Sequence, residues 1–339
     1  MRASVRWQLS EADWEAFLRG CPRATFYHAP AWYRANAETF GLDVAPVLIQ
    51  LSNGEEALLP MAVRAKYRGL VREAVSGVGG GYGGLVTPRP WPLDWVQLAY
   101  REVSSRYPEL FVYSNPFEHY FNAPLPGFGF RMTETSTQAL ALADLELLRD
   151  RYSRSRRKQC RKAMAEGYQI QSLPAQGELE RFYRLYEEAV TEWTSQRWVR
   201  PKSFFERLLC YGGDRLRICY VLKGGEPIGA RLIASYGAVG IGVVYALKRG
   251  HDQGAASSAL TEAALAHCYK EGLRFYDFGA SGSLAGIRYF KESFGAVPLL
   301  GVMAQRQGIA GRVLGHARSA ALWGARLIRL ADGADKPAG

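Results

Sequence analysis

The first 143 residues alternate between amphipathic runs and runs rich in β-branched or aromatic side chains. In Glu11–Leu18 the large apolar side chains recur three or four positions apart, and Ser10 stands where a helix N-cap belongs. Asn53-Gly54 separates two apolar runs, which is a strong signal for a β-hairpin. The predicted elements are helices over 10–18, 30–40 and 94–106, and strands over 44–52, 56–64 and 110–114. This order predicts a first α+β unit.

The rest of the chain repeats this plan on a larger scale. A predicted strand over 136–144 is followed by a long helical stretch over 145–166, which ends at Gly167, a residue suited to the C-terminus of a helix. The further predicted elements are helices over 179–191, 201–211, 255–271 and 309–330, and strands over 215–222, 227–236, 239–247 and 274–278. We therefore expect an α+β (mixed α/β) fold of two related domains with mixed, largely antiparallel sheets. The expected limits are 1–143, 144–305 and a basic C-terminal helix over 306–335.

Charge separates the two halves of the chain. Of the 339 residues, 43 are Lys or Arg and 32 are Asp or Glu, a formal net charge of +11, and the whole surplus lies beyond Ala143. Residues 149–162 contribute a net +7 and residues 306–329 a net +5. This concentration favours an anionic partner for the second half, such as nucleic acid, a nucleotide, an anionic lipid or a phosphorylated substrate.

Two features of the second half suit anion binding. The basic run 149–162 offers arginine forks to phosphate, although a solvated linker helix would explain the same charge. The loop after the strand 239–247 opens a helix whose free N–H groups form a natural anion site, although a tight connection would also contain glycine. The candidate donor-binding or phosphate-binding residues are Arg154, Arg157, Lys158, Arg161, Gly254 and Ala255.

Two titratable residues stand among apolar neighbours further along. Asp277 lies near the C-terminal end of the strand 274–278, where polar side chains often enter a cleft. Lys291 has Tyr289, Phe290 and Phe294 around it in the sequence. An ammonium held against apolar walls could neutralise a phosphate or a developing oxyanion. A surface lysine whose stem covers apolar groups would give the same pattern.

The signatures of several other classes are missing. No GxSxG, HExxH or P-loop sequence occurs and the five histidines are isolated, so we expect neither a serine hydrolase nor a metal site. Residues 79–84 match GxGxxG in form, but a run with two prolines follows where a dinucleotide-binding fold needs a helix. Five scattered cysteines fit a reducing cytosol, and no apolar signal-peptide core is visible. We expect a soluble, cytoplasmic protein.

Several segments, in this order along residues 20–300, resemble the Fem-type branch of the GNAT acyltransferase superfamily. They are TFYHAPAW at 25–32, SRSRRKQCRKA at 153–163 with Glu166-Gly167 after it, RPKSFF at 200–205, GGEPIGA at 224–230, YDFG at 276–279 and FKESFG at 290–295. The resemblance implies two tandem GNAT-like domains and transfer of an acyl group to an amine. The best-known members take an amino acid from aminoacyl-tRNA and add it to the stem peptide of a peptidoglycan precursor.

The resemblance also implies roles for single residues. Lys291 matches the lysine of the family's Phe-Lys-x-x-Phe-Gly motif, which contacts a substrate phosphate or the reacting carbonyl. Arg200 and Tyr245 are similar to substrate-binding residues of the family, and Arg34 stands near the place of a phosphate-binding lysine. Tyr289, beside Lys291, completes the predicted substrate-binding set.

Two departures from the family pattern concern the substrates. Phe204 stands where the family has a tyrosine partner for the arginine matched by Arg200. His251 stands where an ordinary GNAT pyrophosphate loop has Gln or Arg, which weakens the prediction of a coenzyme A site.

The main functional expectation is an aminoacyltransferase without a bound cofactor. It would move an aminoacyl group from tRNA to an amine of a UDP-linked or lipid-linked cell-envelope precursor such as that of peptidoglycan. Lys291 and backbone N–H groups near Gly242–Tyr245 would stabilise the oxyanion, and Asp277 is a candidate base for which a structural role also stays open.

Two other functions remain open at this stage. The first is an acyl-CoA-dependent N-acyltransferase that acts on an amino sugar or metabolite amine. The second is a non-catalytic protein that binds RNA or the anionic inner face of the membrane through its basic segments. The helix over 306–335 either docks on the first domain, as the terminal helix does in the family, or contacts lipid. No oligomeric state is predicted.

Overall fold

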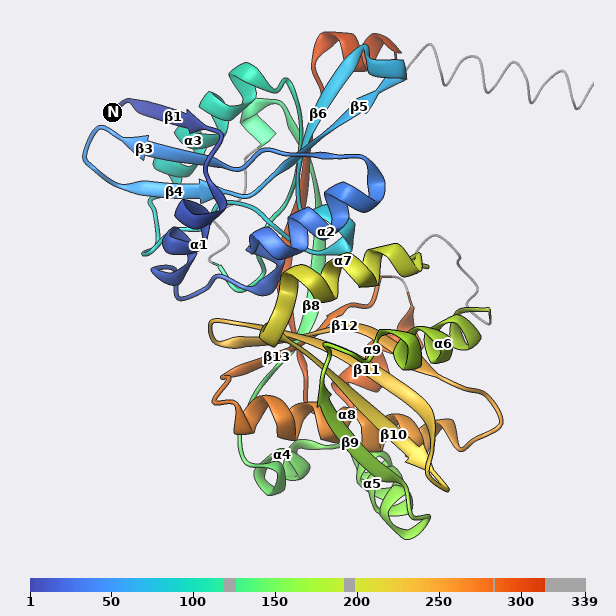
Figure 1. The fold of residues 1–339 in the computed structure, drawn as a ribbon. Coiled ribbons are helices and arrows are strands. Elements are labelled where there is room, and N and C mark those ends of the chain that lie inside the picture. The colour runs from blue at the N-terminus through green and yellow to red at the C-terminus, as the bar shows by residue number, and fades with distance from the viewer. Residues whose placement is uncertain (119–125, 192–198, 283, 315–339) are drawn as a thin grey trace, which may run out of the picture.

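The structure is a computed structural model that describes residues 1–118, 126–191, 199–282 and 284–314. Two lobes lie one above the other and are joined by long strands (Figure 1). The first lobe contains β1 (Ala3–Trp7), α1 (Glu11–Arg19), α2 (Pro30–Phe40), β2 (Asp43–Val44), β3 (Val47–Leu51), β4 (Glu56–Leu59), β5 (Ala62–Lys66), β6 (Val71–Ser76), α3 (Leu93–Arg106) and β7 (Glu109–Tyr113).

The second lobe follows the long strand β8 (Phe130–Ala141). It contains α4 (Leu145–Arg151), α5 (Arg154–Ala165), β9 (Gln169–Pro174), α6 (Leu179–Val190), α7 (Lys202–Gly212), β10 (Leu216–Lys223), β11 (Glu226–Tyr236), β12 (Val239–Leu247), α8 (Gln253–Lys270), β13 (Phe275–Ala280) and α9 (Ala285–Glu292). The strand β14 (Val297–Arg306) then returns to the first lobe.

The strands form two sheets. A small antiparallel sheet in the first lobe has the order β1-β3-β4. The other eleven strands form one continuous sheet in the order β2-β5-β6-β7-β14-β8-β13-β12-β11-β10-β9. Within the described residues, the named strands pair antiparallel except for β6 with β7 and β12 with β13. The expectation of mixed, largely antiparallel sheets is confirmed.

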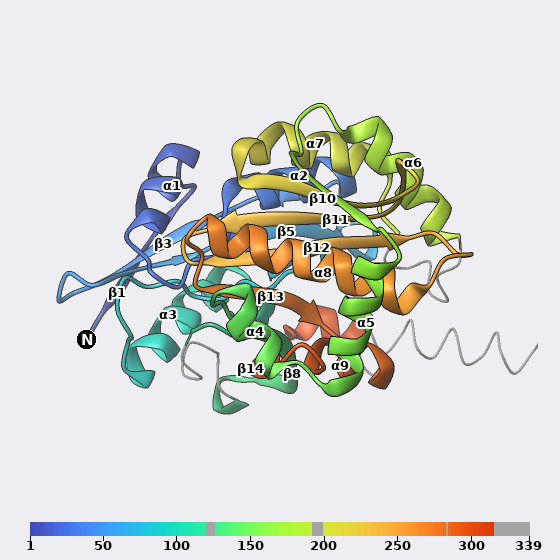
Figure 2. The ribbon, with the colours of Figure 1, turned by 90° about the horizontal axis from the view of Figure 1, so that it is seen from below.

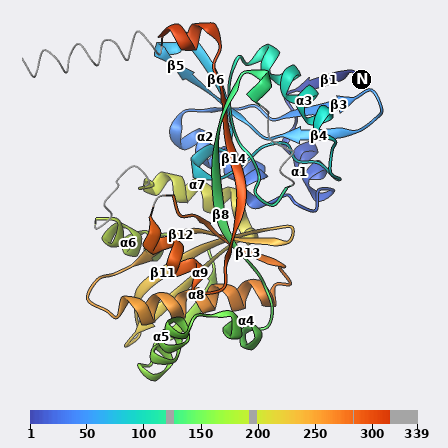
Figure 3. The ribbon, with the colours of Figure 1, turned by 180° about the vertical axis from the view of Figure 1, so that it is seen from behind.

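Two strands carry this sheet from one lobe to the other. β8 and β14 run antiparallel along each other's length and lie side by side between the lobes (Figure 3). β14 also pairs with β7 of the first lobe, and β8 also pairs with β13 of the second. The position of β13, which carries Asp277, is therefore fixed to both lobes through hydrogen-bonded backbone.

The sheet of the second lobe is covered on both faces. Ile218 and Tyr220 of β10 pack with α6 and α7, while Cys219 and Val221 of the same strand pack with α5 and α8 (Figure 2). This alternation is what a strand buried on both faces requires. The core that includes α6 and α7 continues into the first lobe, where Trp32 contacts Phe204 with ring centroids 5.8 Å apart.

Local signals account for most helix limits. Ser10 caps α1 by accepting the N–H of Asp13, and Gly41 ends α2 in a left-handed conformation at φ 66°. The single helix predicted over 145–166 is wrong, because Tyr152 is extended and Ser153 caps a new helix by accepting the N–H of Arg156. The chain there forms α4 and α5 instead.

The structure describes only the beginning of the predicted C-terminal helix. Residues 309–314 are helical, while Arg306 ends β14. The remainder of the predicted helix, and with it most of segment 306–335, lies outside the described residues, so its docking stays a prediction. The expected domain limits 1–143 and 144–305 also stay a prediction. Across the described residues, every helix is too short or too polar to cross a bilayer.

Candidate functional site

An opening in the sheet of the second lobe defines the candidate site. β12 and β13 pair in parallel from Val239↔Phe275 to Ile241↔Asp277, and the pairing stops there although both strands continue. At the same level β12 carries an irregularity against β11, where Leu232 and Ile233 oppose Val244 and Gly242. Residues 242–245 are half-buried, in contrast to the buried ends of the same strand. The separated strands therefore expose backbone and Tyr245 in the middle of a covered sheet.

Lys291 lies at this opening. Its side chain projects from α9 and the residue is only 6% exposed. The Nζ atom donates to the carbonyl oxygens of Gly279 at 2.7 Å and Ala280 at 3.0 Å, at the end of β13. An ammonium has three donors, so one N–H is left without a protein partner among the described residues. Burial lowers the pKa of Lys291 to about 8, while Asp277 acts in the opposite direction.

Asp277 is fully buried on β13. Its Oδ1 atom accepts hydrogen bonds from the Thr137 hydroxyl of β8 and from the N–H of Gly279 at 2.8 Å. Its Oδ2 atom makes no hydrogen bond of 3.5 Å or less among the described residues, although the Tyr82 hydroxyl lies beside the carboxyl. Burial raises the pKa of this carboxyl, and its hydrogen bonds and Lys291 work against that rise. A buried carboxyl of this kind can accept a proton from a substrate that reaches it.

The first lobe contributes to this region through Tyr82. The Tyr82 hydroxyl is buried and lies against the side chains of Thr25 and Asp277. Burial and then the charge of Asp277 hold the pKa of Tyr82 well above its usual range, so the two side chains lie within electrostatic reach. Tyr82 belongs to the glycine-rich loop at 77–84, whose Gly81 could not carry a side chain because a Cβ would lie 2.7 Å from the ring of Tyr27.

Arg200 joins the two lobes beside the same loop. Its Nη2 atom donates to the carbonyl oxygen of Gly79, and its backbone N–H donates to the Tyr186 hydroxyl at 2.7 Å. The guanidinium also lies over the rings of Phe40 and Phe204, 5.3 Å and 5.1 Å from the centroids. Burial lowers the pKa of Arg200. The structure thus brings this predicted substrate-binding residue to the lobe junction.

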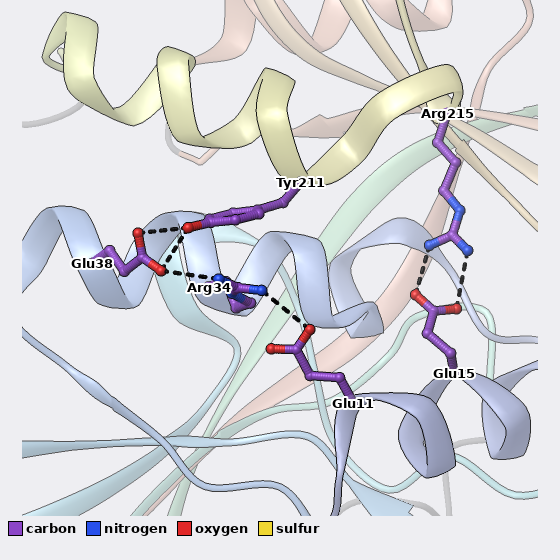
Figure 4. A network of polar contacts seen from close by, with 6 residues as sticks. All are labelled: Glu11, Glu15, Arg34, Glu38, Tyr211 and Arg215. Atoms are coloured by element: carbon purple, nitrogen blue, oxygen red, sulfur yellow. Dashed lines mark hydrogen bonds and ion pairs between the residues drawn. The ribbon is translucent and has the colours of Figure 1, made fainter.

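Arg34 lies in a different setting, a network of polar contacts between α1, α2 and α7 (Figure 4). It forms ion pairs with Glu11 at 3.3 Å and Glu38 at 3.5 Å, and its guanidinium lies 3.9 Å from the ring centroid of Tyr211. Its predicted phosphate contact stays a prediction. Tyr289, another predicted substrate-binding residue, is 62% exposed on α9.

The predicted phosphate ligands of the second lobe do not converge on one point. The four basic residues predicted on α5 are exposed, and Arg157 donates to the Tyr152 carbonyl oxygen at 2.7 Å. At the start of α8, Asp252 accepts the N–H of Ala255 at 2.9 Å, which occupies one donor of the predicted anion site. A Cβ on Gly254 would lie 2.9 Å from the Gln159 side chain, so glycine there allows α5 and α8 to approach.

The sequence analysis missed two arginines that reach the opening. Arg156 is buried on α5, and Arg231 is buried in the middle of β11. Helical spacing was the available signal for Arg156, which lies four positions before Cys160 on the buried face of α5. For Arg231 the signal was a single charge inside the apolar run IGARLIAS.

The arrangement suits acyl transfer. Within the part of the chain that the structure describes, the ammonium of Lys291 has one donor left over, and β12 beyond Ile241 is not paired with β13. These groups can stabilise an oxyanion at the opening, and Asp277 is the nearby carboxyl that could accept a proton. Among the described residues, no cluster of three or more His, Cys, Asp and Glu side chains is arranged to hold a metal ion.

Comparisons with known proteins agree with this chemistry. Residues 149–292, which contain Tyr245, Asp277 and Lys291, match the family described as acetyltransferase (GNAT) domain. A search of curated proteins found no match.

Solved structures with the same fold extend over nearly the whole chain. FemX is similar at a TM-score of 0.68 and 11% identity, over 89% of this chain and 97% of that one. The C-terminal domain of a putative lysylphosphatidylglycerol synthetase from Agrobacterium fabrum is similar at a TM-score of 0.59 and 12% identity, over 90% and 95%. L-PGS from Bacillus licheniformis is similar at 0.55 and 13%, over 88% and 92%. Residues 149–292 therefore match a GNAT acetyltransferase domain, and the chain as a whole has a fold similar to that of FemX.

Proposed function

We propose that the protein is an aminoacyltransferase that moves an aminoacyl group from tRNA to an amine of a peptidoglycan or other cell-envelope precursor. The observation that carries the proposal is Lys291, a buried ammonium with a free donor at the opening between β12 and β13 of a GNAT domain. Similarity of fold to FemX and to the C-terminal domain of a putative lysylphosphatidylglycerol synthetase supports an aminoacyl donor.

The reaction needs a neutral amine, an ester and a stabilised oxyanion. The amine nitrogen attacks the ester carbonyl, and the carbonyl electron pair moves onto the oxygen, where Lys291 donates a hydrogen bond. When the tetrahedral species collapses, the C–N bond is kept and the ester C–O bond breaks. The attacking amine gives up one proton, for which Oδ2 of Asp277 is the candidate acceptor. That proton passes to the departing ribose oxygen, which leaves as a hydroxyl while the carboxylate is restored.

An acyl-CoA-dependent N-acyltransferase is the second candidate. It is favoured by the description of the matching family as an acetyltransferase domain. The capping of Ala255 by Asp252 argues against it, because it occupies a donor at the helix start where a GNAT domain would hold pyrophosphate.

A transfer assay with purified protein tests the proposal. Charged tRNA carrying a labelled amino acid is offered with a UDP-linked or a lipid-linked muropeptide, and acyl-CoAs are offered in parallel. We expect label in the muropeptide with tRNA as donor and none with acyl-CoA. Transfer from acyl-CoA alone would establish the second candidate, and no transfer from any donor would contradict both.

A further inference from the structure

Two buried arginines in the second lobe lack the carboxylate partners that buried charges normally have. Arg156 is 8% exposed and Arg231 is 7% exposed. Among the described residues, the hydrogen-bond partners of both guanidinium groups are hydroxyl groups, and no carboxylate forms an ion pair with them. Buried charges are usually paired, because removing a lone charge from water is costly. The two charges therefore need an explanation.

Arg156 is held firmly by neutral groups. Its Nε donates to the Ser293 hydroxyl at 2.9 Å and its Nη1 to the Ser258 hydroxyl at 2.6 Å. The guanidinium lies over the rings of Phe290 and Phe294, 4.5 Å and 4.7 Å from their centroids. These contacts orient the fork and use Nε and Nη1, so the side chain is pre-organised and no carboxylate of the described residues neutralises its charge.

Arg231 approaches from the neighbouring strand. Its Nη1 donates to the Tyr276 hydroxyl at 2.9 Å, and its guanidinium carbon lies 5.1 Å from the ring centroid of Tyr245. Its Nε is buried and has no hydrogen-bond partner in the described part of the chain. An unmade hydrogen bond of a buried charged group is costly, which indicates that a ligand completes it.

The guanidinium of Arg231 lies over the ring of Tyr245 and within electrostatic reach of Lys291. Both arginines act electrostatically on the Tyr245 hydroxyl, and Arg231 also acts on the ammonium of Lys291. The negative charge of Asp277 acts on the ammonium of Lys291. Tyr245 itself belongs to the half-buried stretch 242–245 of β12. An excess of buried positive charge thus borders the opening at which the acyl group is expected.

We propose that Arg156, Arg231 and Tyr245 bind a phosphate of the acyl donor immediately beside the reacting carbonyl. This deepens the proposed function and rests on it for the identity of the reaction. A phosphate beside the carbonyl distinguishes the donor classes. In an amino acid esterified to a 3′-terminal nucleotide, the 5′-phosphate of that nucleotide is only a few bonds from the ester. In an acyl-CoA the whole pantetheine arm separates the thioester from the diphosphate, so the site selects the nucleotide ester.

Binding of adenosine 5′-monophosphate tests the site without turnover. This probe carries the nucleoside and phosphate of the tRNA terminus, and adenosine serves as the same probe without phosphate. Calorimetry on the full chain should give an affinity at least about tenfold higher for adenosine 5′-monophosphate than for adenosine, as charge-assisted hydrogen bonds to one phosphate imply. In Arg231→Met we expect this preference to fall to less than about threefold.

Matched variants make the result specific. Arg181 is also a guanidinium over a tyrosine ring, 4.3 Å from the centroid of Tyr220, but it has the carboxylate of Glu178 at 3.6 Å. Arg181→Met should leave the phosphate preference unchanged. Because Arg156 ties three helices together, Arg156→Met could fail to fold. Arg156→Lys, which keeps the charge but loses the fork, is the substitute and should lower the preference at least threefold.

Each outcome decides the inference. The inference is overturned if Arg231→Met still prefers adenosine 5′-monophosphate over adenosine, or if the wild type shows no such preference. Coenzyme A that binds in an Arg231-dependent manner, with no affinity for adenosine 5′-monophosphate, overturns the assignment of donor class. Loss of the preference in the arginine variants supports the site even if no aminoacyl transfer is found, in which case only the proposed function fails. Transfer from tRNA with an unaltered phosphate preference in those variants contradicts only the inference.

Discussion

Two groups of arginines in this molecule are treated in opposite ways. At the surface between α1, α2 and α7, Arg34 and Arg215 each meet carboxylates, and the pair of Arg215 with Glu15 is bidentate at 2.7 Å and 3.0 Å (Figure 4). In the interior of the second lobe, the polar and aromatic partners of Arg156 and Arg231 among the described residues are hydroxyl groups and aromatic rings. A buried charge costs more free energy than an exposed one, yet the buried arginines are the ones without carboxylate partners.

This difference separates a structural role from a functional one. Surface pairs that are complete in the free protein hold the lobes together weakly and are screened by salt. Buried charges left without counter-charges destabilise the free protein and are retained where a ligand supplies the missing charge. We therefore expect substitutions in the two regions to have different signs as well as different sizes.

The largest effect is expected from removing the buried ammonium. Lys291→Met should lower the rate of transfer by about 100-fold to 1000-fold, because one oxyanion donor is lost. The measurement is single-turnover transfer of labelled amino acid. Lys270→Met removes an exposed lysine of α8 and serves as the control, which should keep the wild-type rate. A Lys291→Met variant with the wild-type rate would remove Lys291 from the site.

The pH dependence gives a second test of the same group. With a pKa of about 8, Lys291 is protonated below that pH and neutral above it. If the ammonium stabilises the oxyanion, the rate should fall about tenfold per pH unit above about pH 8. The arginine in Lys291→Arg keeps its charge at all accessible pH values. The fall in transfer rate above about pH 8, the alkaline limb of the pH profile, should therefore be absent from this variant even if its rate is low. An alkaline limb that is identical in both proteins would contradict the assignment.

A smaller effect, a gain in the stability of the free protein, is expected from removing one buried charge. The double variant Arg231→Met, Tyr276→Phe removes an unpaired buried charge together with its hydrogen-bond partner, so no polar atom of that pair is left unsatisfied. The free energy of unfolding should rise by about 1–2 kcal/mol, measured by urea denaturation without ligand. A variant less stable than the wild type would show that Arg231 stabilises the fold.

Part of the buried site could be predicted from the sequence. Asp277 and Lys291 stood out as titratable residues among apolar neighbours, and the structure brings both to the region where β12 and β13 separate. Arg156 was hidden inside a run of eight basic residues, because charge counting cannot distinguish one buried side chain from seven others. Only the helical position relative to Cys160 carries that information.

Other features depend on pairings that no local pattern sets. β8 and β14 pair although more than 150 residues separate Phe130 from Val297 along the chain, and β14 was not predicted at all. The approach of Tyr82 to Asp277 likewise follows from the packing of one lobe on the other. The break at Ser153 is a local signal, since serine is a good N-cap, but the surrounding helical run outweighed it in the prediction.

The smallest effect is expected at the surface network. Glu15→Gln keeps the size of the side chain and removes the charge that holds Arg215 and accepts the Tyr236 hydroxyl at 3.1 Å. Because the two charged side chains are 21% and 38% exposed, the free energy of unfolding should fall by only about 0.5 kcal/mol, and the loss should shrink at high salt. Glu11→Gln, at a single 3.3 Å contact, is a milder control. Affinity for adenosine 5′-monophosphate should be unchanged in both, and a change would show that the surface network and the buried arginines are coupled rather than independent.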